Sequence, residues 1–578
     1  MHYGGAQGQQ AQCWADLASS LNPLSAMGMS GDGRAHSEAL AGLRLAVTAA
    51  DLEQLEHRGI AAYSRNLLKA LAAGGAEVWL ITEFDPKLVV PGFKRLPRAT
   101  RELLQAAKIL DDLCAGHSAP EMSSYRMETV LPPGMQRLNR TGKRWQQKIW
   151  AWFSPYIPVQ LIPRDYREDQ MPVILVHEHR DNPYLRHQRL DYLDGVTGIL
   201  CAPRFFGKAN WLASRMAQRG VRLKLHSFDA LITTCPINLS GDGTTPILQT
   251  IHDLIPIEFA RHGESPVAFT RRLQAALGQN RLFMSRASQT KYHRYIGQDH
   301  EVETVVVQPP SLLLDTRLEP SQTNPDITAG NDDITWRWLP QAERHSSSQG
   351  HTPAHELQTL RYFLFNSSIE PRKNTIFLVK AFLESKLYER GYSLCITGSL
   401  KQDSYSDTLR KIVGRSPHIL LTGYVDEPTK LELYSHALAL VSPSLVEGFG
   451  IPLLDAACMG LPAIASESAS HAEIRDIHDF KEFITLLRTI KTTPWATFMQ
   501  KFADSREWLS PREAQDLVAQ RLNRYAKMRE LVDKSFSLSL YQAIKTLCGT
   551  NTNNQLETSA KKFEVDTTPE KEATTSAY

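Results

Sequence analysis

Hydrophobic positions along the chain form two series of short apolar runs, and amphipathic or polar segments separate the runs. The first series opens with a buried-strand pattern at Leu43–Thr48, an amphipathic segment with Ile60, Tyr63 and Leu67 on one face, and a second run at Val78–Thr82. This strand, helix, strand order predicts a parallel sheet with a ligand crevice at the carboxyl ends of its strands. Further strands of this sheet are expected at 230–233, 247–251, 283–285 and 305–307.

The second series predicts another parallel sheet. Strands are expected at 363–366, 394–397 and 419–422, with a helix at 375–384. The series ends in the stretch Leu438–Glu473, where an apolar run is followed by a Ser/Pro/Gly-rich turn, a short segment and a second apolar run. Pro452 suits a first helical turn, and Gly460 suits the position after the last turn. The stretch is therefore interpreted as strand, loop, short helix and strand.

The start of this short helix predicts an anion site. Its first amide groups, with those of the loop Gly448, Phe449 and Gly450, lack partners within the helix, and the helix dipole favours negative charge there. Two carboxylates, Glu447 and Asp455, flank the same end of the helix. Amides for an anion and carboxylates for hydroxyl groups together suit a phosphorylated sugar.

Length and composition predict two domains with extensions. The chain has 578 residues, 42% hydrophobic and 22% charged, with a formal net charge of +3. We expect an arm at 1–42, a first α/β domain at 43–313 with an insertion at about 85–200, a linker at 314–356, a second α/β domain at 357–480, helices at 481–548 and a disordered tail at 549–578. Seven cysteines without a C-x-x-C pair favour reduced thiols, and no signal peptide or spanning segment is evident, so we expect a cytoplasmic protein. No nucleic-acid-binding motif is found.

The insertion contains one amphipathic segment of unusual composition. Trp145, Ile149 and Trp152 recur at helical spacing beside Lys143, Arg144 and Lys148. Aromatic, basic and amphipathic character together indicates a helix that lies on an anionic membrane, at the inner face for a cytoplasmic protein. The favoured alternative is a helix that packs these tryptophans onto its own domain.

Four further residues lie where ligands bind in open α/β sheets. Gly59 lies in the turn after the first strand, His252 ends the strand at 247–251, and Arg372 and Lys373 follow the strand at 363–366. Two cations there would neutralise a diphosphate. Each residue also has an ordinary interpretation: a turn glycine, a core histidine and an exposed charge pair.

Several of these motifs together resemble a known family. The runs FLFNSSIEPRKNTIFLVKAFL, ILLTGYVDEPTKLELYSHALALV and SPSLVEGFGIPLLDAACMGLPAIAS are similar to the C-terminal half of family 4 retaining glycosyltransferases of GT-B fold. RGIAAYSRNLLKAL and LQTIHDLIPIEF carry a thinner likeness in the first half.

The resemblance implies two Rossmann-like domains that face a cleft, with a nucleotide-diphosphate sugar held mainly by the second. It implies that Arg372 and Lys373 grip the diphosphate, that Glu447 binds sugar hydroxyls, and that His252 contributes from the first domain. Gly59, Gly448, Phe449, Gly450 and Asp455 would complete the donor site. No D-x-D motif occurs, in agreement with the family's independence of a metal cofactor. Glu447 and Lys373 are expected to be partly exposed in the cleft.

The chain departs from the family pattern at two points. Asp455 stands where the family has a second glutamate, and the usual glycine-containing strand is absent after Glu473, with a helical segment predicted from Asp479 onward. The first hypothesis is a transferase that builds a cell-surface polysaccharide or lipopolysaccharide on a glycan or lipid-linked acceptor. The alternatives are a degenerate GT-B protein that binds sugar nucleotide or partners without transfer, and another GT-B enzyme such as a sugar-nucleotide epimerase.

Overall fold

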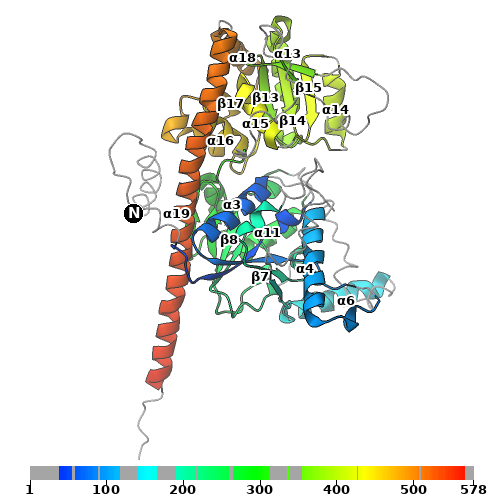
Figure 1. Ribbon diagram of the computed structural model, residues 1–578, viewed down its shortest axis with the longest axis vertical. Helices are drawn as coiled ribbons and strands as arrows, with labels where there is room; N and C mark the ends of the chain where they lie inside the picture. Colours follow the sequence, from blue (N-terminus) through cyan, green and yellow to red (C-terminus); the bar gives the residue numbers. More distant parts are fainter. Residues whose placement is uncertain are drawn as a thin grey trace, which may run out of the picture.

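Two α/β domains stack along the long axis of the molecule, and one long helix runs beside both (Figure 1). The computed structural model describes residues 38–565 except 55–58, 89–90, 117–139, 166–189, 216–218, 260–263, 313–334, 339–354, 402, 415, 426 and 507–508. The predicted arm therefore lies almost entirely outside the described residues. None of the helices in the described part of the chain is long and apolar enough to cross a membrane.

The N-terminal domain is built on an eight-stranded sheet in the order β10-β9-β8-β6-β1-β2-β4-β3. Its strands are β1 Arg44–Thr48, β2 Glu77–Thr82, β3 Ile162–Asp165, β4 Gly198–Cys201, β6 Ala230–Thr233, β8 Ile247–Ile251, β9 Asn280–Phe283 and β10 Glu303–Val305. All pairs are parallel except β3 with β4. The helices are α3 Gly59–Ala73, α4 Arg98–Ala115, α6 Arg140–Phe153, α9 Phe205–Ser214, α10 Ile255–Glu258, α11 Pro266–Ala275 and α12 Arg286–Tyr295, and β5 Val221–Arg222 pairs with β7 Leu239–Ser240.

The C-terminal domain is built on a six-stranded parallel sheet in the order β15-β14-β13-β16-β17-β18. Its strands are β13 Tyr362–Asn366, β14 Ser393–Thr397, β15 Ile419–Gly423, β16 Ala439–Ser442, β17 Ala463–Ser466 and β18 Ile484–Leu487. The helices are α13 Thr375–Ser385, α14 Ser404–Val413, α15 Glu427–His436, α16 Ile451–Met459, α17 Ala469–Arg475, α18 Thr492–Arg506 and α19 Pro511–Val565. The two α/β domains face each other, and each is built on a sheet of mainly parallel strands. This arrangement confirms the predicted GT-B fold class.

Local sequence explains the element that positions the site. α16 begins at Ile451 with Pro452 in its first turn, and it ends where Gly460 adopts a left-handed φ of 72°. A proline costs little in a first turn because that amide has no partner within the helix, and glycine enters the left-handed region without a Cβ clash. The helix from Leu453 to Met459 is buried, so its apolar side chains fix its direction against the sheet.

Two expectations about the second half are corrected, and a pair of strands is found within the predicted linker. The segment around Ile484–Leu487, predicted to be helical, is strand β18, which pairs with β17 and completes the sheet after Glu473. α19 continues to Val565, so the tail predicted from 549 onward begins too early. Within the linker predicted at 314–356, β11 Thr335–Trp338 pairs with β12 His355–Gln358.

α19 connects the two domains. Near its start Tyr525, Met528 and Val532 belong to a core cluster of the C-terminal domain. Further on, Phe536 and Tyr541 belong to the core cluster of the N-terminal domain. The helix is therefore a packed part of both cores, as its course beside both domains indicates (Figure 1).

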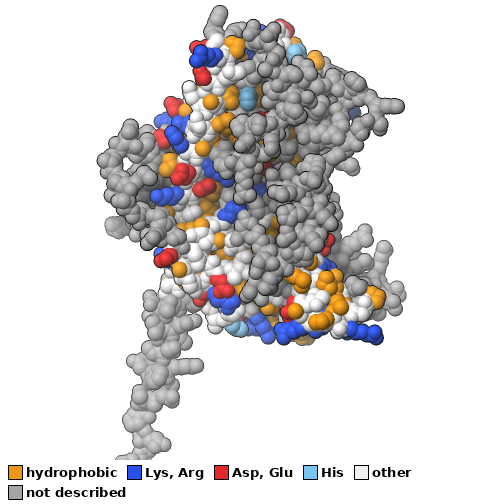
Figure 2. Space-filling model, viewed as in Figure 1, with side chains coloured by type: hydrophobic (Ala, Val, Ile, Leu, Met, Phe, Trp, Pro, Cys, Tyr) orange, Lys and Arg blue, Asp and Glu red, His pale blue; other side chains and the backbone are white. Residues whose placement is uncertain are grey.

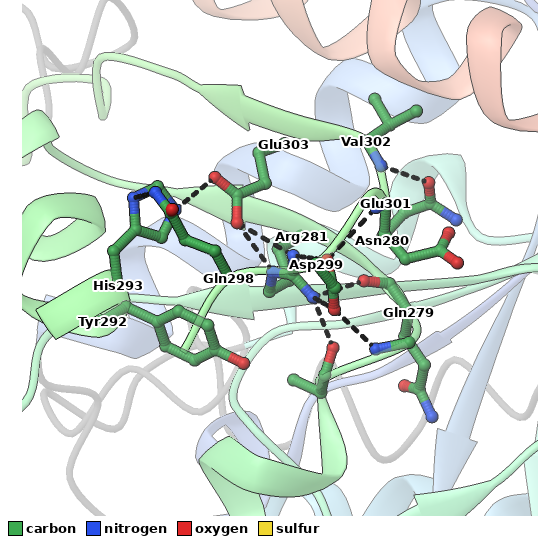
Figure 3. Close-up of polar contacts among 12 residues, drawn as sticks. Gln279, Asn280, Arg281, Tyr292, His293, Gln298, Asp299, Glu301, Val302 and Glu303 are labelled. Carbon is green, nitrogen blue, oxygen red and sulfur yellow. Dashed lines mark hydrogen bonds and ion pairs between the residues drawn. The ribbon is translucent and has the colours of Figure 1, made fainter. Parts of the chain in front are cut away.

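A buried ion cluster fixes the edge of the N-terminal sheet (Figure 3). The fully buried Arg281 on β9 donates from Nη1 to Asp299 at 2.8 Å and from Nε to Glu303 at 3.0 Å. Glu303 also contacts His293 Nε2 at 2.7 Å, and the guanidinium lies over the ring of Tyr292. Hydrogen bonds and positive charge from Arg281 lower the pKa of Asp299 to about 2. The cluster thus ties β9 and β10 to the end of α12.

Candidate functional site

A cavity of about 460 Å³ lies between the two domains. Its walls come from the first turns of α3, the end of β8, the loops after β13, β14 and β15, and the loop before α16. Eight of the nine predicted site residues line it: Gly59, His252, Arg372, Lys373, Glu447, Gly448, Phe449 and Gly450. The ninth, Asp455, does not. The geometry thus brings together groups that the sequence places about 400 residues apart, because strand ends of both sheets meet here.

A compact ion cluster forms one wall of the cavity. Lys373 Nζ donates to Glu447 Oε1 at 2.5 Å, and Arg372 Nη1 lies 3.6 Å from Glu447 Oε2. Arg372 and Lys373 lie in a short 3-10 turn, Pro371–Lys373, that follows β13. The cluster therefore holds two cations and one carboxylate side by side at the cavity surface.

Charge pairing outweighs burial in setting the pKa of Glu447, whereas burial outweighs charge pairing in setting the pKa of Lys373. Burial alone would raise the pKa of Glu447, but the positive charges of Lys373 and Arg372 hold it at about 2. Burial lowers the pKa of Lys373, and the contact with Glu447 opposes that shift. The expectation that Glu447 and Lys373 are partly exposed is wrong: they are 8% and 6% exposed. Each needs the other, because an unpaired buried charge is strongly destabilising.

Glu370 extends the cluster in a way that the sequence did not indicate. Its carboxylate accepts from Arg372 Nε at 3.0 Å and from Lys401 Nζ at 3.0 Å. The charges of Arg372 and Lys401 outweigh burial and lower the pKa of Glu370 to about 2. Arg372 is therefore held between two carboxylates, Glu370 and Glu447, which fixes its guanidinium at the cavity wall.

The loop before α16 touches the opposite domain. A Cβ on Gly448 would lie 2.5 Å from Cβ of Asp253 and 3.0 Å from the carbonyl oxygen of His252. The Gly448 carbonyl accepts from Ser285 Oγ at 2.9 Å and from Ser288 Oγ at 3.2 Å. Only glycine permits this approach, so the loop that supplies amides to the cavity is also where the domains meet.

A second contact between the domains lies beside this loop. Glu473 accepts from the backbone amides of Arg286 at 2.8 Å and Ala287 at 3.2 Å, the first residues of α12. A carboxylate at a helix start satisfies free amides and interacts favourably with the helix dipole. The C-terminal domain therefore caps a helix of the N-terminal domain.

His252 faces the cavity from the end of β8. Its Nε2 lies 2.7 Å from the carbonyl oxygen of Thr234, and its ring meets Tyr63 edge to face. A carbonyl oxygen only accepts hydrogen bonds, so Nε2 carries the proton. Burial lowers the pKa of His252, which keeps the ring neutral at physiological pH.

Asp455 lies behind the cavity instead of in its wall. It is fully buried, and its oxygens accept from the Ser311 amide and hydroxyl, both at 2.6 Å, and from the Tyr525 hydroxyl at 3.1 Å. Burial raises the pKa of Asp455 to about 6, although these hydrogen bonds oppose the shift. Its contacts join α16, α19 and the segment that leaves the N-terminal domain. The geometry gives Asp455 a role in holding these elements together.

Asp455→Asn should change how stability depends on pH. The folded state binds this proton more tightly than the unfolded chain, whose pKa is 3.8, so the wild type loses stability as pH rises from 4 to 6. The amide of the variant does not titrate. The unfolding free energy of the variant minus that of the wild type should therefore increase by about 3 kcal/mol from pH 4 to pH 6. Thermal unfolding of both proteins at several pH values measures this shift.

The matched control is Asp504→Asn, at a surface ion pair with Arg390 whose side chains are half exposed. The same measurements on this variant show the effect of replacing a carboxylate at the surface. A constant difference between Asp455→Asn and the wild type would contradict the assignment.

Other cavity residues were not predicted from the sequence. Asn366 ends β13, Gly398 follows β14, and Tyr424 follows β15. Each lies at the carboxyl end of a parallel strand, and that position is the signal that would have found them. Gly398 is constrained as well, because a Cβ there would lie 1.9 Å from the carbonyl oxygen of Ser367.

Comparison with known proteins finds a family model that matches one segment of the chain. Residues 351–479 match the family model described as "Glycosyl transferases group 1". This domain contains Arg372, Lys373, Glu447 and the loop before α16. The chain is also 33% identical over 117 residues to the O-antigen chain mannosyltransferase B of Escherichia coli, which covers 20% of this chain and 30% of that protein.

Two further similarities cover different shares of the chain. The chain is 33% identical over 122 residues to the serotype-specific mannosyltransferase WbdA of Escherichia coli, across 21% of this chain and 14% of that protein. The chain thus spans less than a third of the length of these curated relatives. The structure of sucrose-phosphate synthase from Thermosynechococcus elongatus aligns over 89% of this chain and all of that one, with 14% identity and a TM-score of 0.44.

Proposed function

We propose that the protein is a retaining glycosyltransferase that moves a sugar from a nucleotide-diphosphate sugar to an acceptor hydroxyl. One observation carries the proposal: Arg372, Lys373 and the amino end of α16 face the same cavity as Glu447. The positive charge of the two side chains and of the helix end suits a diphosphate. The carboxylate of Glu447 is a hydrogen-bond acceptor that suits sugar hydroxyls. Retention at the anomeric carbon rests on the family resemblance of the donor-site motifs.

The proposed reaction uses these groups electrostatically. As the bond from the anomeric carbon to the diphosphate oxygen breaks, negative charge grows on the diphosphate, and Arg372 and Lys373 stabilise it. The amides of Gly448, Phe449 and Gly450 add fixed dipoles on the same side. The oxygen of the acceptor hydroxyl then bonds to the anomeric carbon, and its proton passes to the leaving diphosphate oxygen. Because the two side chains supply the positive charge, transfer is proposed to need no metal ion.

The remaining groups would orient the sugar. Glu447 already accepts from Lys373, and a carboxylate has further lone pairs for a sugar hydroxyl. Neutral His252 keeps Nδ1 as an acceptor, because its proton is on Nε2. Gly59 would bring the backbone at the start of α3 close to the bound donor.

The names of the relatives support a proposal for the substrate class. The names of two of them describe mannosyltransferases, one acting on the O-antigen chain. We therefore propose mannosyl transfer to a glycan or lipid-linked acceptor in cell-surface polysaccharide or lipopolysaccharide synthesis, on the cytoplasmic side of the membrane.

Thermal unfolding with a panel of nucleotide sugars tests the donor assignment. GDP-mannose, UDP-glucose, UDP-N-acetylglucosamine and the corresponding free nucleotides are added in the presence of EDTA, and nucleotide release is measured in parallel. We expect one nucleotide sugar to raise the unfolding temperature by several degrees and to be turned over without added metal. The enzyme proposal loses its basis if no nucleotide sugar stabilises the protein.

The position of Asp455 favours one alternative, a degenerate protein that binds sugar nucleotide without transfer. Its carboxylate faces Ser311 and Tyr525, so it is not at the cavity to bind a ribose. Stabilisation by a nucleotide sugar without transfer or nucleotide release would support that alternative. Conversion of the donor to an epimer would support an epimerase.

A further inference from the structure

α6 and the turn after it expose six large hydrophobic side chains, which we call the aromatic patch: Trp145, Ile149, Trp152, Phe153, Tyr156 and Ile157. Trp145 is 71% exposed and Trp152 is 65% exposed. The expectation that α6 packs these tryptophans onto its own domain is therefore wrong, and Trp150 alone among the tryptophans of α6 packs against that domain's core. Figure 2 shows hydrophobic side chains with Lys and Arg beside them at the lower right, where Figure 1 places α6.

Basic residues accompany the aromatic patch. α6 carries Arg140, Lys143, Arg144 and Lys148 and contains no acidic residue. Lys148 Nζ lies 5.7 Å from the ring centre of Trp145, and Arg219 lies 5.2 Å from that of Tyr156. Contiguous exposed apolar surface is costly in water unless it meets a partner. Its basic surroundings indicate a partner that is apolar in its interior and negatively charged at its surface.

A second cavity, of about 280 Å³, adjoins the aromatic patch. Three cations line it: Lys87, Arg204 and Lys208, together with Trp150 of α6. Lys208 Nζ donates to the carbonyl oxygen of Ile157, a member of the patch, at 2.9 Å. Within the described part of the chain, no carboxylate forms a salt bridge with any of the three. Burial lowers the pKa of Lys208 to about 8, so an anion in this cavity would strengthen its positive charge.

Backbone conformation adds an independent observation at this cavity. Arg204, just before α9, has a left-handed φ of 64°. Such a conformation costs a residue with a Cβ about 1–3 kcal/mol, and such residues gather at ligand sites. The conformation holds an arginine at the wall of a cavity that is rich in positive charge.

We propose that the aromatic patch docks the protein on an anionic phospholipid bilayer and that the three-cation cavity receives the phosphate of a lipid headgroup. Tryptophan and tyrosine rings favour the boundary between headgroups and acyl chains, and Lys and Arg side chains reach the anionic surface. Two such contacts together bind a membrane more firmly than either alone. The patch lies at the end of the N-terminal domain away from the C-terminal domain (Figure 1), so docking there would not involve the C-terminal domain.

Vesicle flotation of the full chain tests the patch. The wild type should float with phosphatidylcholine vesicles that contain phosphatidylglycerol and much less with phosphatidylcholine alone. Trp145→Ala/Trp152→Ala should lower the fraction bound to anionic vesicles roughly tenfold. The matched control is Ile490→Ala, a 79% exposed side chain on the other domain, which should float like the wild type. Equal flotation of the double tryptophan variant and the wild type, or no flotation of the wild type, would overturn the proposal.

A second variant tests the cavity. Lys87→Gln/Lys208→Gln should weaken binding to anionic vesicles several-fold and leave binding to neutral vesicles unchanged, and inorganic phosphate should compete weakly. Unchanged binding to anionic vesicles would overturn the assignment of the cavity to a lipid phosphate. Circular dichroism and thermal unfolding establish that each variant is folded. Flotation needs no turnover, so its outcome is independent of the proposed transferase activity.

Discussion

Lys373→Gln should reduce sugar transfer by roughly 10²–10³-fold or more, the usual cost of removing one group that stabilises charge in a transition state. The same change should destabilise the fold, because it leaves Glu447 buried beside Arg372 with its closest cation removed. Breaking a buried ion pair by removing one partner costs about 3–5 kcal/mol. Activity and stability must therefore be separated before the loss of transfer is assigned to catalysis.

The double variant Lys373→Gln/Glu447→Gln makes that separation. Two neutral amides can hydrogen-bond to each other in the same space, so the double variant should recover most of the lost unfolding temperature. Transfer should stay at least as low as in Lys373→Gln, because the cation at the diphosphate and the carboxylate proposed to bind the sugar are both missing. Both quantities are measured on the same preparation, by thermal unfolding and by nucleotide release with the donor that the panel identifies.

Arg390→Gln is the matched control, because it removes a cation from a surface ion pair in the same domain. It should leave both unfolding temperature and transfer close to the wild type. If the double variant regained transfer together with stability, the role of Lys373 would be structural and the proposed electrostatic role would be wrong.

Gly448→Ala should lower transfer by roughly 10²-fold while both domains stay folded, because a misplacement of about 1 Å between reacting groups has an effect of that size. The added Cβ would lie 2.5 Å from Cβ of Asp253. Both Cβ atoms are bonded directly to the backbone, so a side-chain rotation cannot relieve the clash. The domains must therefore separate locally, which moves Arg372 and Lys373 away from His252. Kinetics measures the loss, and small-angle scattering measures the greater separation of the domains.

The matched control is Gly549→Ala, because a Cβ at that helical position meets nothing within 4 Å. Its scattering curve and rate should equal those of the wild type. Wild-type transfer in Gly448→Ala would show that the arrangement of the two domains described here is not the one in which transfer occurs.

Most of the sheet framework could be predicted, because buried parallel strands are continuous apolar runs. The runs that form β1, β6, β8 and β13 are buried along almost their whole length, and no helical periodicity competes with them. β18 was missed because Ile484–Leu487 lies within a segment whose apolar spacing also fits a helix. Pairing with β17 decides the matter, and such a tertiary contact is not visible in a short run.

The site was predicted unevenly for a similar reason. Residues at strand ends, such as His252 and Arg372, were found because topology alone brings strand ends together. The ion pair of Glu370 with Lys401 was not predicted. The two residues follow different strands, and no sequence motif connects them. Asp455 was assigned to the donor site because of its spacing from Glu447. Its carboxylate instead accepts a hydrogen bond from Ser311, which lies 144 residues away in the sequence.

The shared helix α19 also restricts how the cavity can open. Its 55 residues span roughly 80 Å at 1.5 Å per residue, and its segments 525–532 and 536–548 belong to the hydrophobic cores of different domains. Pulling the domains straight apart would tear one half of the helix from its core, whereas rotating them about the helix would keep both packed. α19 is therefore the axis about which the two domains can rotate. For the proposed transferase, donor entry and product release would then require rotation of the two domains about α19.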